Sequence, residues 1–192
     1  LTAIKKFIFT YKFIEEEQLY EKVASLIYEN KVIGWFQGRS EFGPRALGNR
    51  SILANPNNPK MKHILDLHFK YRDRYRPYAP AVLEEYVEKY FDISGTSPVM
   101  MTGGKVLRKD FPAITHVDGT GRLQAINKQF NEKYYKLIHE FKQISGIPMV
   151  INTSFNIMGQ PIIENPTEAI KCFLGNGLDF LVLGDYLIKK ET

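Results

Sequence analysis

The chain has 192 residues, 44% of them hydrophobic and 24% charged, and a formal net charge of +5 at pH 7. These values fit one globular domain with a substantial core and favour an anionic ligand such as a nucleotide, a phosphorylated metabolite or nucleic acid. The single cysteine, Cys172, excludes an intrachain disulfide framework and a cysteine-only metal cluster, and we expect it to be a buried structural thiol.

The ends of the chain and its hydropathy indicate where the protein works. No apolar run approaches the length of a membrane span, so we expect no membrane partner. The opening "LTAIKKFIF" has no initiator Met and lacks the form of a signal peptide. We therefore expect a cytoplasmic protein whose residues 1–192 are a fragment of a longer polypeptide.

The first third of the chain predicts a helix, a strand and a second helix. Apolar residues at i, i+4, i+7 and i+8 predict an amphipathic helix over about residues 15–30. "VIGWF", residues 32–36, is typical of a buried strand. Asn58 as a cap and Pro59 at the first helical position predict a helix whose apolar face extends to Phe69.

The middle of the chain predicts a site-bearing region followed by a third helix. Residues 92–122 have weak periodicity and many Gly, Thr and Pro residues, which predicts loops and hairpins. Apolar residues from Phe130 to Phe141 predict a helix that ends at Gly146. "IPMVIN", residues 147–152, is the clearest buried strand in the sequence.

The last part of the chain predicts a helix and two short strands. Asn165, Pro166 and Glu168 form a capping-box-like start to a helix that ends near Gly175. Residues 179–189 predict two strands around a tight Gly-Asp turn. Strands and helices are interspersed without strict alternation, so we expect a single α/β domain with a mixed, twisted sheet and helices packed on it.

A first candidate site lies in "SEFGPRALGNRS", residues 40–51. The Gly-Pro break changes the chain direction, so its arginines cannot share one smooth strand face. The planar guanidinium of Arg45 or Arg50 suits phosphate or carboxylate because it donates two parallel hydrogen bonds. The alternative is a surface loop whose arginines pair with Glu41 and other carboxylates.

A second candidate site is "KYRDRYRP", residues 70–77, where cations alternate with other residues. If the segment is extended, Lys70, Arg72, Arg74 and Arg76 share one face and repel one another unless an anion or carboxylates lie among them. A bound anion, nucleic acid and a solvated basic strand edge all remain open from the spacing alone.

A third candidate site is "THVDGTGRLQ", residues 115–124. Residues 118–121 predict a turn between two short strands, flanked by Thr115, His116 and Arg122. One histidine without a partner carboxylate that the sequence identifies is weak support for acid–base chemistry, and a structural role is the default. The histidines form no zinc-binding pattern, so we expect no metal ligands in this chain.

A fourth candidate site, "NTSFNIMGQP", follows the strand at 147–152. Asn152, Thr153, Ser154 and Asn156 therefore lie where open α/β sheets usually bind ligands, at the carboxyl end of a strand. The alternative is an Asx- or Ser-type turn. The sequence has no P-loop and no nucleophile elbow, which disfavours P-loop and α/β-hydrolase chemistry.

In order, these four segments resemble the C-terminal domain of the NodU/CmcH-type O-carbamoyltransferases, from about residue 20 to 190. The segment "ENPTEAIKCFLGNGLDFLVLGDYLI" is similar to that domain's closing helix and strands. The resemblance implies a YrdC-like α/β fold. The family's spaced signature, K-x-R and S-x-N, corresponds here to Lys70-Tyr71-Arg72 and Ser154-Phe155-Asn156.

The resemblance also implies a two-step carbamoyl transfer. This domain would form carbamoyl-adenylate from carbamoyl phosphate and ATP, with Mg²⁺ sharing the phosphate charge, and release phosphate and pyrophosphate. A separate N-terminal Kae1-like domain of the same polypeptide, carrying a transition metal, would pass the carbamoyl group to an acceptor hydroxyl. On its own, this chain would catalyse at most the adenylate-forming half.

The resemblance assigns roles to individual residues. Carbamoyl phosphate and developing charge would be held by Arg45, Lys70, Arg76 and Arg122, with Ser154 as a further substrate contact. Nucleotide and acyl contacts would come from Arg72, Ser154 and Asn156, with Thr115 and His116 lining the adenylate pocket. Lys70, Arg72, Ser154 and Asn156 are the expected catalytic set, and Arg50 is expected to support its loop through hydrogen bonds to backbone.

Two other functions remain as alternatives. A YrdC-like module that binds double-stranded RNA would use the same basic residues, but here they lie among Gly, Pro and Ser rather than in Lys-rich runs, so we do not expect a nucleic-acid partner. A threonylcarbamoyl-adenylate synthase would use bicarbonate and threonine in place of carbamoyl phosphate. "SEFGPRALG" and "NTSFN" resemble the carbamoyltransferases more closely.

Overall fold

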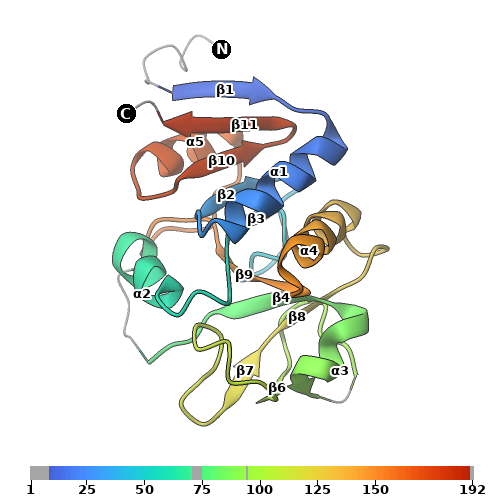
Figure 1. The fold of residues 1–192 in the computed structure, drawn as a ribbon. Helices are drawn as coiled ribbons and strands as arrows, with labels where there is room; N and C mark the ends of the chain where they lie inside the picture. The colour runs from blue at the N-terminus through green and yellow to red at the C-terminus, as the bar shows by residue number, and fades with distance from the viewer. Residues whose placement is uncertain (1–8, 71–74, 94, 191–192) are drawn as a thin grey trace.

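The computed structural model describes residues 9–70, 75–93 and 95–190. An eight-stranded sheet with the order β1-β11-β10-β2-β3-β9-β4-β8 forms its centre (Figure 1). The pairs β10–β2 and β4–β8 are parallel and the other neighbours are antiparallel, so the sheet is mixed. The strands span β1 Phe9–Phe13, β2 Ile33–Phe36, β3 Arg50–Ala54, β4 Ala79–Leu83, β8 Gln124–Ile126, β9 Met149–Ser154, β10 Phe180–Leu183 and β11 Tyr186–Lys190.

A smaller antiparallel sheet and several helices complete the fold. The three-stranded sheet consists of β5 (Phe91–Asp92), β6 (Gly103–Val106) and β7 (Thr120–Arg122). This arrangement agrees with the loops and hairpins predicted over 92–122. The helices are α1 Glu16–Tyr28, α2 Met61–Leu65, α3 Val87–Tyr90, α4 Glu132–Ser145 and α5 Pro166–Leu174, with a 3₁₀ turn at Glu84–Tyr86.

Two apolar layers hold the main sheet between its helices. On one face, α1 and α4 lie side by side and bury a cluster that includes Leu19, Trp35 and Phe141 (Figure 1). On the other face, residues from α2, α5 and the small sheet form a second cluster that includes Met61 and Phe173. The predicted α/β domain with a mixed sheet and packed helices is therefore confirmed.

Most of the predicted elements are present, with local differences. Asn58 accepts a hydrogen bond from the Lys60 amide at 2.9 Å, but α2 begins only at Met61, and it continues as a π-helical turn over Asp66–Lys70. The predicted caps of α4 and α5 are confirmed, since Gly146 is left-handed after α4 and the Asn165 side chain accepts from the Glu168 amide. The predicted two-strand ending is also confirmed, as β10 and β11 pair around residues 184–185.

Two further expectations can be compared with the structure. Cys172 is buried in α5, and this burial raises the pKa of its thiol to about 11, so the thiol is protonated at neutral pH. This agrees with a structural role rather than a nucleophilic one. Among the helices that the structure describes, none combines the length and the apolar character needed to cross a bilayer.

Candidate functional site

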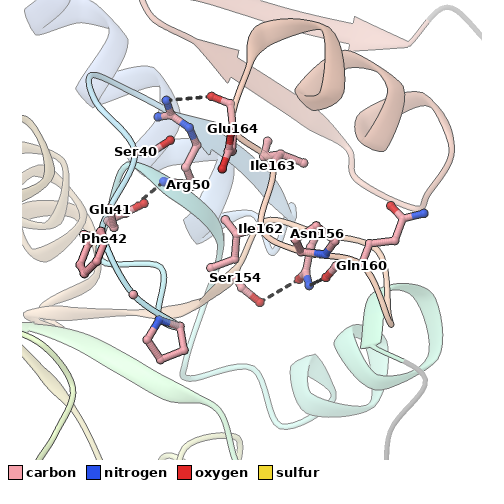
Figure 2. Close-up of a pocket in the computed structure, with 13 residues that line it drawn as sticks. Ser40, Glu41, Phe42, Arg50, Ser154, Asn156, Gln160, Ile162, Ile163 and Glu164 are labelled. Atoms are coloured by element: carbon pink, nitrogen blue, oxygen red, sulfur yellow. Dashed lines mark hydrogen bonds between the residues drawn. The ribbon is translucent and has the colours of Figure 1, made fainter.

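Lys70, Ser154 and Asn156 lie in direct contact. The Lys70 ammonium donates hydrogen bonds to the Ser154 carbonyl (2.7 Å), the Ser154 hydroxyl (3.2 Å) and Asn156 Oδ1 (2.7 Å). The Ser154 hydroxyl also donates to Asn156 Oδ1 at 2.8 Å (Figure 2). Lys70 is only 9% exposed, and these acceptors compensate for the burial of its charge. Lys70 of the K-x-R motif and the S-x-N motif therefore meet in the fold.

The π-helical turn at the end of α2 directs Lys70 toward β9. A π turn adds a residue to the helical repeat and changes the direction of the side chains that follow, and such turns are frequent at functional sites. Asp66 opens this turn and accepts hydrogen bonds from Lys62 (2.6 Å) and from the Tyr78 hydroxyl (2.7 Å). The helix end is thus tied to the segment that leads into β4.

Three predicted arginines and the predicted histidine line one hollow of about 540 Å³, which we call the arginine hollow. Its walls are Arg45, Tyr75, Arg76, Pro77, Tyr78, Ala79, His116, Thr120, Gly121 and Arg122. Apart from Tyr78 and Ala79, these residues come from three of the four sequence segments. Among the carboxylates that the structure describes, none forms an ion pair with Arg45 or Arg76.

Figure 2 shows a second hollow, of about 510 Å³, which we call the serine hollow. It is lined by residues 40–44, 154, 156 and 160–164, together with 50. A small hollow of about 120 Å³ connects them, since it shares Ser154 with the serine hollow and Arg45 and Arg122 with the arginine hollow. The Lys70 cluster and the arginines therefore border one continuous depression.

The turn before β7 brings a carboxylate close to His116. A turn is present, with φ +82° at Gly119, but it spans residues 116–119 rather than the predicted 118–121, because Thr120 and Gly121 belong to β7 and the Thr120 carbonyl accepts from the His116 amide at 2.7 Å. The prediction of a strand before the turn is wrong, because residues 107–119 form turns and coil that close around Gly119. Asp118 lies 3.4 Å from His116 Nδ1, and hydrogen bonds from the Thr120 hydroxyl and amide, followed by His116, lower the pKa of Asp118.

Two of the predicted site residues are not placed in the depression. Thr115 lines none of the three hollows, because its hydroxyl donates to the Phe111 carbonyl at 2.8 Å within the preceding turn. Arg72 belongs to residues 71–74, which lie outside the described part of the chain. An extended segment over residues 70–76 would place its cations on one face. This arrangement is wrong for Lys70, which lies in the π-helical turn.

Arg50 supports the loop that carries Arg45, as predicted. Its side chain is buried at the start of β3, and its guanidinium lies 3.6 Å from the centre of the Phe36 ring. It donates hydrogen bonds to four carbonyls: Gln37 (2.6 Å), Asn49 (2.9 Å), Gly38 (3.2 Å) and Glu164 (3.2 Å). Burial lowers the pKa of Arg50, and the nearby Glu41 opposes that shift.

Buried amide side chains that the sequence did not identify as supports hold the same loop from below. Asn152 donates to the Ala46 carbonyl (3.1 Å) and to Gln124 Oε1 (2.8 Å), and Gln124 donates to the Leu47 carbonyl (2.9 Å). Asn152 was predicted to contact a ligand, but in the structure its side-chain NH₂ group supports this loop instead. A polar residue inside the apolar stretch "LQAI" was the only sequence signal for Gln124.

The chain's family is evident from comparison with known proteins. Residues 24–190 match the family described as "Carbamoyltransferase C-terminus". The chain belongs to this family. It is 44% identical over 177 residues to Nodulation protein NolNO of Sinorhizobium fredii, covering 89% of this chain and 26% of that protein. It is 38% identical to Uncharacterized protein sll1178 of Synechocystis, covering 95% of this chain and 33% of that protein. The chain thus spans a third or less of these relatives.

Solved structures support the fold. P. abyssi Sua5 complexed with L-threonine superposes with a TM-score of 0.65 at 18% identity, covering 90% of this chain and 48% of Sua5. Full-length HypF in its phosphate- and nucleotide-bound form superposes with a TM-score of 0.58 at 16% identity, covering 95% of this chain and 22% of HypF. The expected YrdC-like fold is confirmed.

Proposed function

We propose that this module forms carbamoyl-adenylate from carbamoyl phosphate and ATP. An N-terminal Kae1-like domain of the same polypeptide would then pass the carbamoyl group to the hydroxyl of an acceptor molecule. The observation that carries the proposal is the junction of the Lys70–Ser154–Asn156 cluster with the arginine hollow. Convergent cations beside hydroxyl and amide groups suit a small phosphorylated substrate placed next to a nucleotide.

The reaction proceeds in two steps, hydrolysis of carbamoyl phosphate and adenylation of the carbamate. Water attacks the phosphorus of carbamoyl phosphate, and the bond from phosphorus to the bridging oxygen breaks to give carbamate and phosphate. A carbamate oxygen then attacks the α-phosphorus of ATP, and the bond to the departing pyrophosphate breaks. Both steps need positioning and charge stabilisation more than covalent catalysis by the protein.

The side chains divide this work. Arg45, Arg76 and Arg122 hold the phosphate of carbamoyl phosphate and stabilise charge as it develops. Lys70 fixes the Ser154 hydroxyl and the Asn156 amide at the edge of the serine hollow, where they contact the nucleotide and the carbamate. Arg72 and His116 contact the nucleotide. Thr115 does not contact it but supports the turn before His116 through its hydrogen bond to the Phe111 carbonyl.

The residues that border the depression fit Mg²⁺ bound mainly to substrate phosphates. In the described part of the chain, His, Cys, Asp and Glu side chains form no group of three or more that could hold a metal ion. On the walls of the three described hollows, Glu164 is the carboxylate left for this role, because Glu41 Oε1 accepts hydrogen bonds from backbone amides. Mg²⁺ usually keeps several waters and binds one or two carboxylates together with phosphates, and its charge would offset that of the triphosphate.

The test is pyrophosphate release by the full-length protein with ATP and carbamoyl phosphate. Release requires both substrates and falls at least about 100-fold in Lys70→Ala and about 10-fold in Ser154→Ala. Lys142→Ala is a matched control, because this lysine contacts the Tyr86 ring away from the depression and the variant should keep wild-type activity. If the full-length protein neither binds these substrates nor releases pyrophosphate, the proposal is wrong.

The same assay separates the alternatives. Release that depends on bicarbonate and L-threonine, and that carbamoyl phosphate does not stimulate, would identify a threonylcarbamoyl-adenylate synthase instead. Affinity for double-stranded RNA that falls steeply with salt and is unchanged by Ser154→Ala would identify an RNA-binding module. Each of these results contradicts carbamoyl-adenylate formation as the main activity.

A further inference from the structure

The loop that carries Arg45 is an arch held by side chains from several elements. It joins β2 to β3, which pair antiparallel with Phe36 opposite Arg50. We call residues 42–46 the arch. We propose that Glu41 is a positioning residue that clamps the arch and so fixes Arg45 in the arginine hollow, an inference that rests on the proposed function. Glu41 acts through Arg45 rather than by touching the substrate.

The clamp consists of one carboxylate oxygen and the backbone at the far side of the arch. Glu41 Oε1 accepts hydrogen bonds from three amides: Leu47 (2.8 Å), Asn49 (2.6 Å) and Arg50 (3.2 Å). Hydrogen bonds to an ionised acceptor are about twice as strong as those between neutral groups. Glu41 therefore connects the residue before the arch to the residues after it, and Arg45 lies between these two points.

Two further contacts hold the arch from the side of the sheet. Asn152 and Gln124 donate to the Ala46 and Leu47 carbonyls, and both amide side chains are at most 2% exposed. The backbone on either side of the Arg45 side chain is thus fixed, while that side chain is exposed and faces the hollow. Such support of a functional group by neighbouring hydrogen bonds limits how far the group can move from its productive position.

The charge of Glu41 is used in a way that leaves Arg45 available. A carboxylate paired with Arg45 would neutralise the charge that an anion needs. Here the Glu41 carboxylate is occupied by amides, and among the described carboxylates none pairs with Arg45. Its second oxygen, Oε2, is buried and has no hydrogen-bond partner in the described part of the chain. In Glu41→Gln, the side-chain NH₂ group would replace Oε2 at a position where the described structure offers no hydrogen-bond acceptor.

The experiment is a double-mutant cycle in the full-length protein, measured as carbamoyl phosphate affinity by calorimetry. Glu41→Gln keeps the shape and should weaken carbamoyl phosphate binding about 5-fold, and Glu41→Ala about 20-fold, with ATP affinity changed less than about 3-fold. In an Arg45→Ala background, Glu41→Gln should have almost no further effect. Arg39→Ala is the matched control, since its side chain is exposed in the same loop and lines none of the three hollows.

Amide hydrogen exchange supplies a readout that does not depend on the function. Glu41→Gln should speed exchange at Leu47 and Asn49 by about 10-fold or more, because their acceptor is weakened. Additive effects of Glu41→Gln and Arg45→Ala on carbamoyl phosphate affinity overturn this inference and leave the proposed function standing. If the wild type does not bind carbamoyl phosphate, the proposed function fails, and unchanged exchange at the two amides would then overturn the clamp as well.

Discussion

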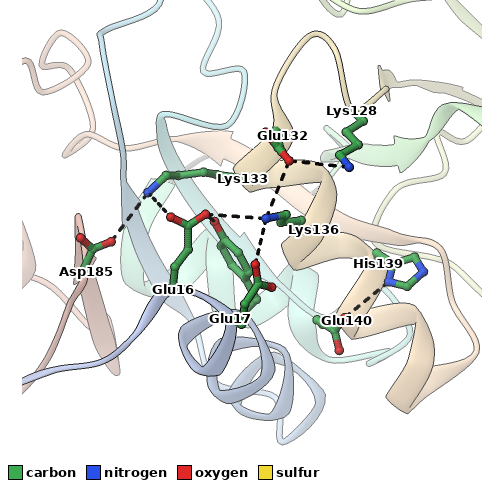
Figure 3. Close-up of polar contacts among 10 residues, drawn as sticks. Glu16, Glu17, Lys128, Glu132, Lys133, Lys136, His139, Glu140 and Asp185 are labelled. Carbon is green, nitrogen blue, oxygen red and sulfur yellow. Dashed lines mark hydrogen bonds and ion pairs between the residues drawn. The ribbon is translucent and has the colours of Figure 1, made fainter.

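The arginine hollow and the seam between α1 and α4 both gather cations, and they differ in what surrounds them. The seam consists of Glu16, Glu17, Glu132, Lys133, Lys136 and Asp185 (Figure 3). Lys133 lies 3.3 Å from Glu16 and 3.7 Å from Asp185, and Lys136 lies 2.9 Å from Glu17. In the hollow, no described carboxylate pairs with Arg45 or Arg76.

The difference shows which cations are available to a ligand. In the seam each ammonium is paired and partly exposed, so its charge is neutralised and each pair stabilises the fold only slightly. In the hollow Arg45 and Arg76 have no such partner among the described carboxylates, which costs stability but creates a site for an anion. The carboxylate closest to Arg45 in sequence, Glu41, is directed to backbone amides instead.

The largest expected effect comes from Gly48→Ala, because Gly48 joins the two regions. Gly48 has φ +107°, and a Cβ there would lie 2.2 Å from the Tyr134 ring on α4, the helix that also carries the seam lysines. Backbone strain and overpacking together should lower the free energy of unfolding by about 3 kcal/mol. Urea denaturation measures this change.

Gly119→Ala is the control for that substitution. Gly119 has φ +82° but has no atom within 4 Å of its Cβ position, so only backbone strain remains and the loss should be about 1 kcal/mol. Equal losses in the two variants would contradict the close packing of the loop on α4.

A direct test of the comparison is Arg45→Ala beside Lys136→Ala. Removing Arg45 should weaken carbamoyl phosphate binding about 30-fold, equivalent to about 2 kcal/mol, and ATP binding by less than about 3-fold. Removing Lys136, which is already paired with Glu17, should leave both affinities unchanged. Calorimetric titration of the full-length protein measures both. Equal losses of carbamoyl phosphate affinity would show that general charge, and not the hollow, attracts the ligand.

The sequence predicted the elements with strong periodicity and missed those whose pattern is set by tertiary contacts. The amphipathic helices α1, α4 and α5 and the apolar strand β9 were predictable because burial imposes a regular spacing. β4 was not, since "APAVL" contains a proline, which usually excludes a central strand, yet β4 lies between β9 and β8.

The candidate site was predictable as a set of segments but not as a geometry. Spacing identified the segments of Arg45, Lys70, Arg122 and Ser154, and the fold brings them to one depression. Spacing could not show that Lys70 turns toward Ser154, because this depends on a π turn that no local pattern indicates. The use of Glu41 as a clamp was likewise hidden, since it depends on amides six to nine residues away.

A smaller effect is expected in the seam from Tyr20→Phe. The Tyr20 hydroxyl donates to Glu16 at 2.6 Å and is the main cause that lowers the pKa of Glu16, followed by Lys133 and Lys136. A carboxyl whose folded pKa is lowered stabilises the fold above its unfolded pKa, and this contribution is lost as the pH falls through the folded value. The variant should be less stable by about 0.5–1 kcal/mol at pH 7.

Acidification checks that assignment. The difference between wild type and Tyr20→Phe should narrow as the pH falls below about 4.3, the usual pKa of a glutamate. Urea denaturation at pH 7, 5 and 3.5 measures the trend. If the difference in unfolding free energy between the two proteins does not change over this pH range, it comes from packing of the buried Tyr20 ring and not from the hydrogen bond to Glu16.

The smallest effect should be that of Lys136→Ala on stability. Its partners in the seam are exposed, and the hydrogen bond to Glu17 is the main cause that raises the pKa of Lys136. Exposed pairs lose most of their attraction to solvent and salt, so the melting temperature should change by no more than about 2 °C, and less still in 1 M NaCl. Scanning calorimetry at two salt concentrations measures this change. A large, salt-resistant drop would contradict this and would mean that solvent does not screen the ion pairs of the seam.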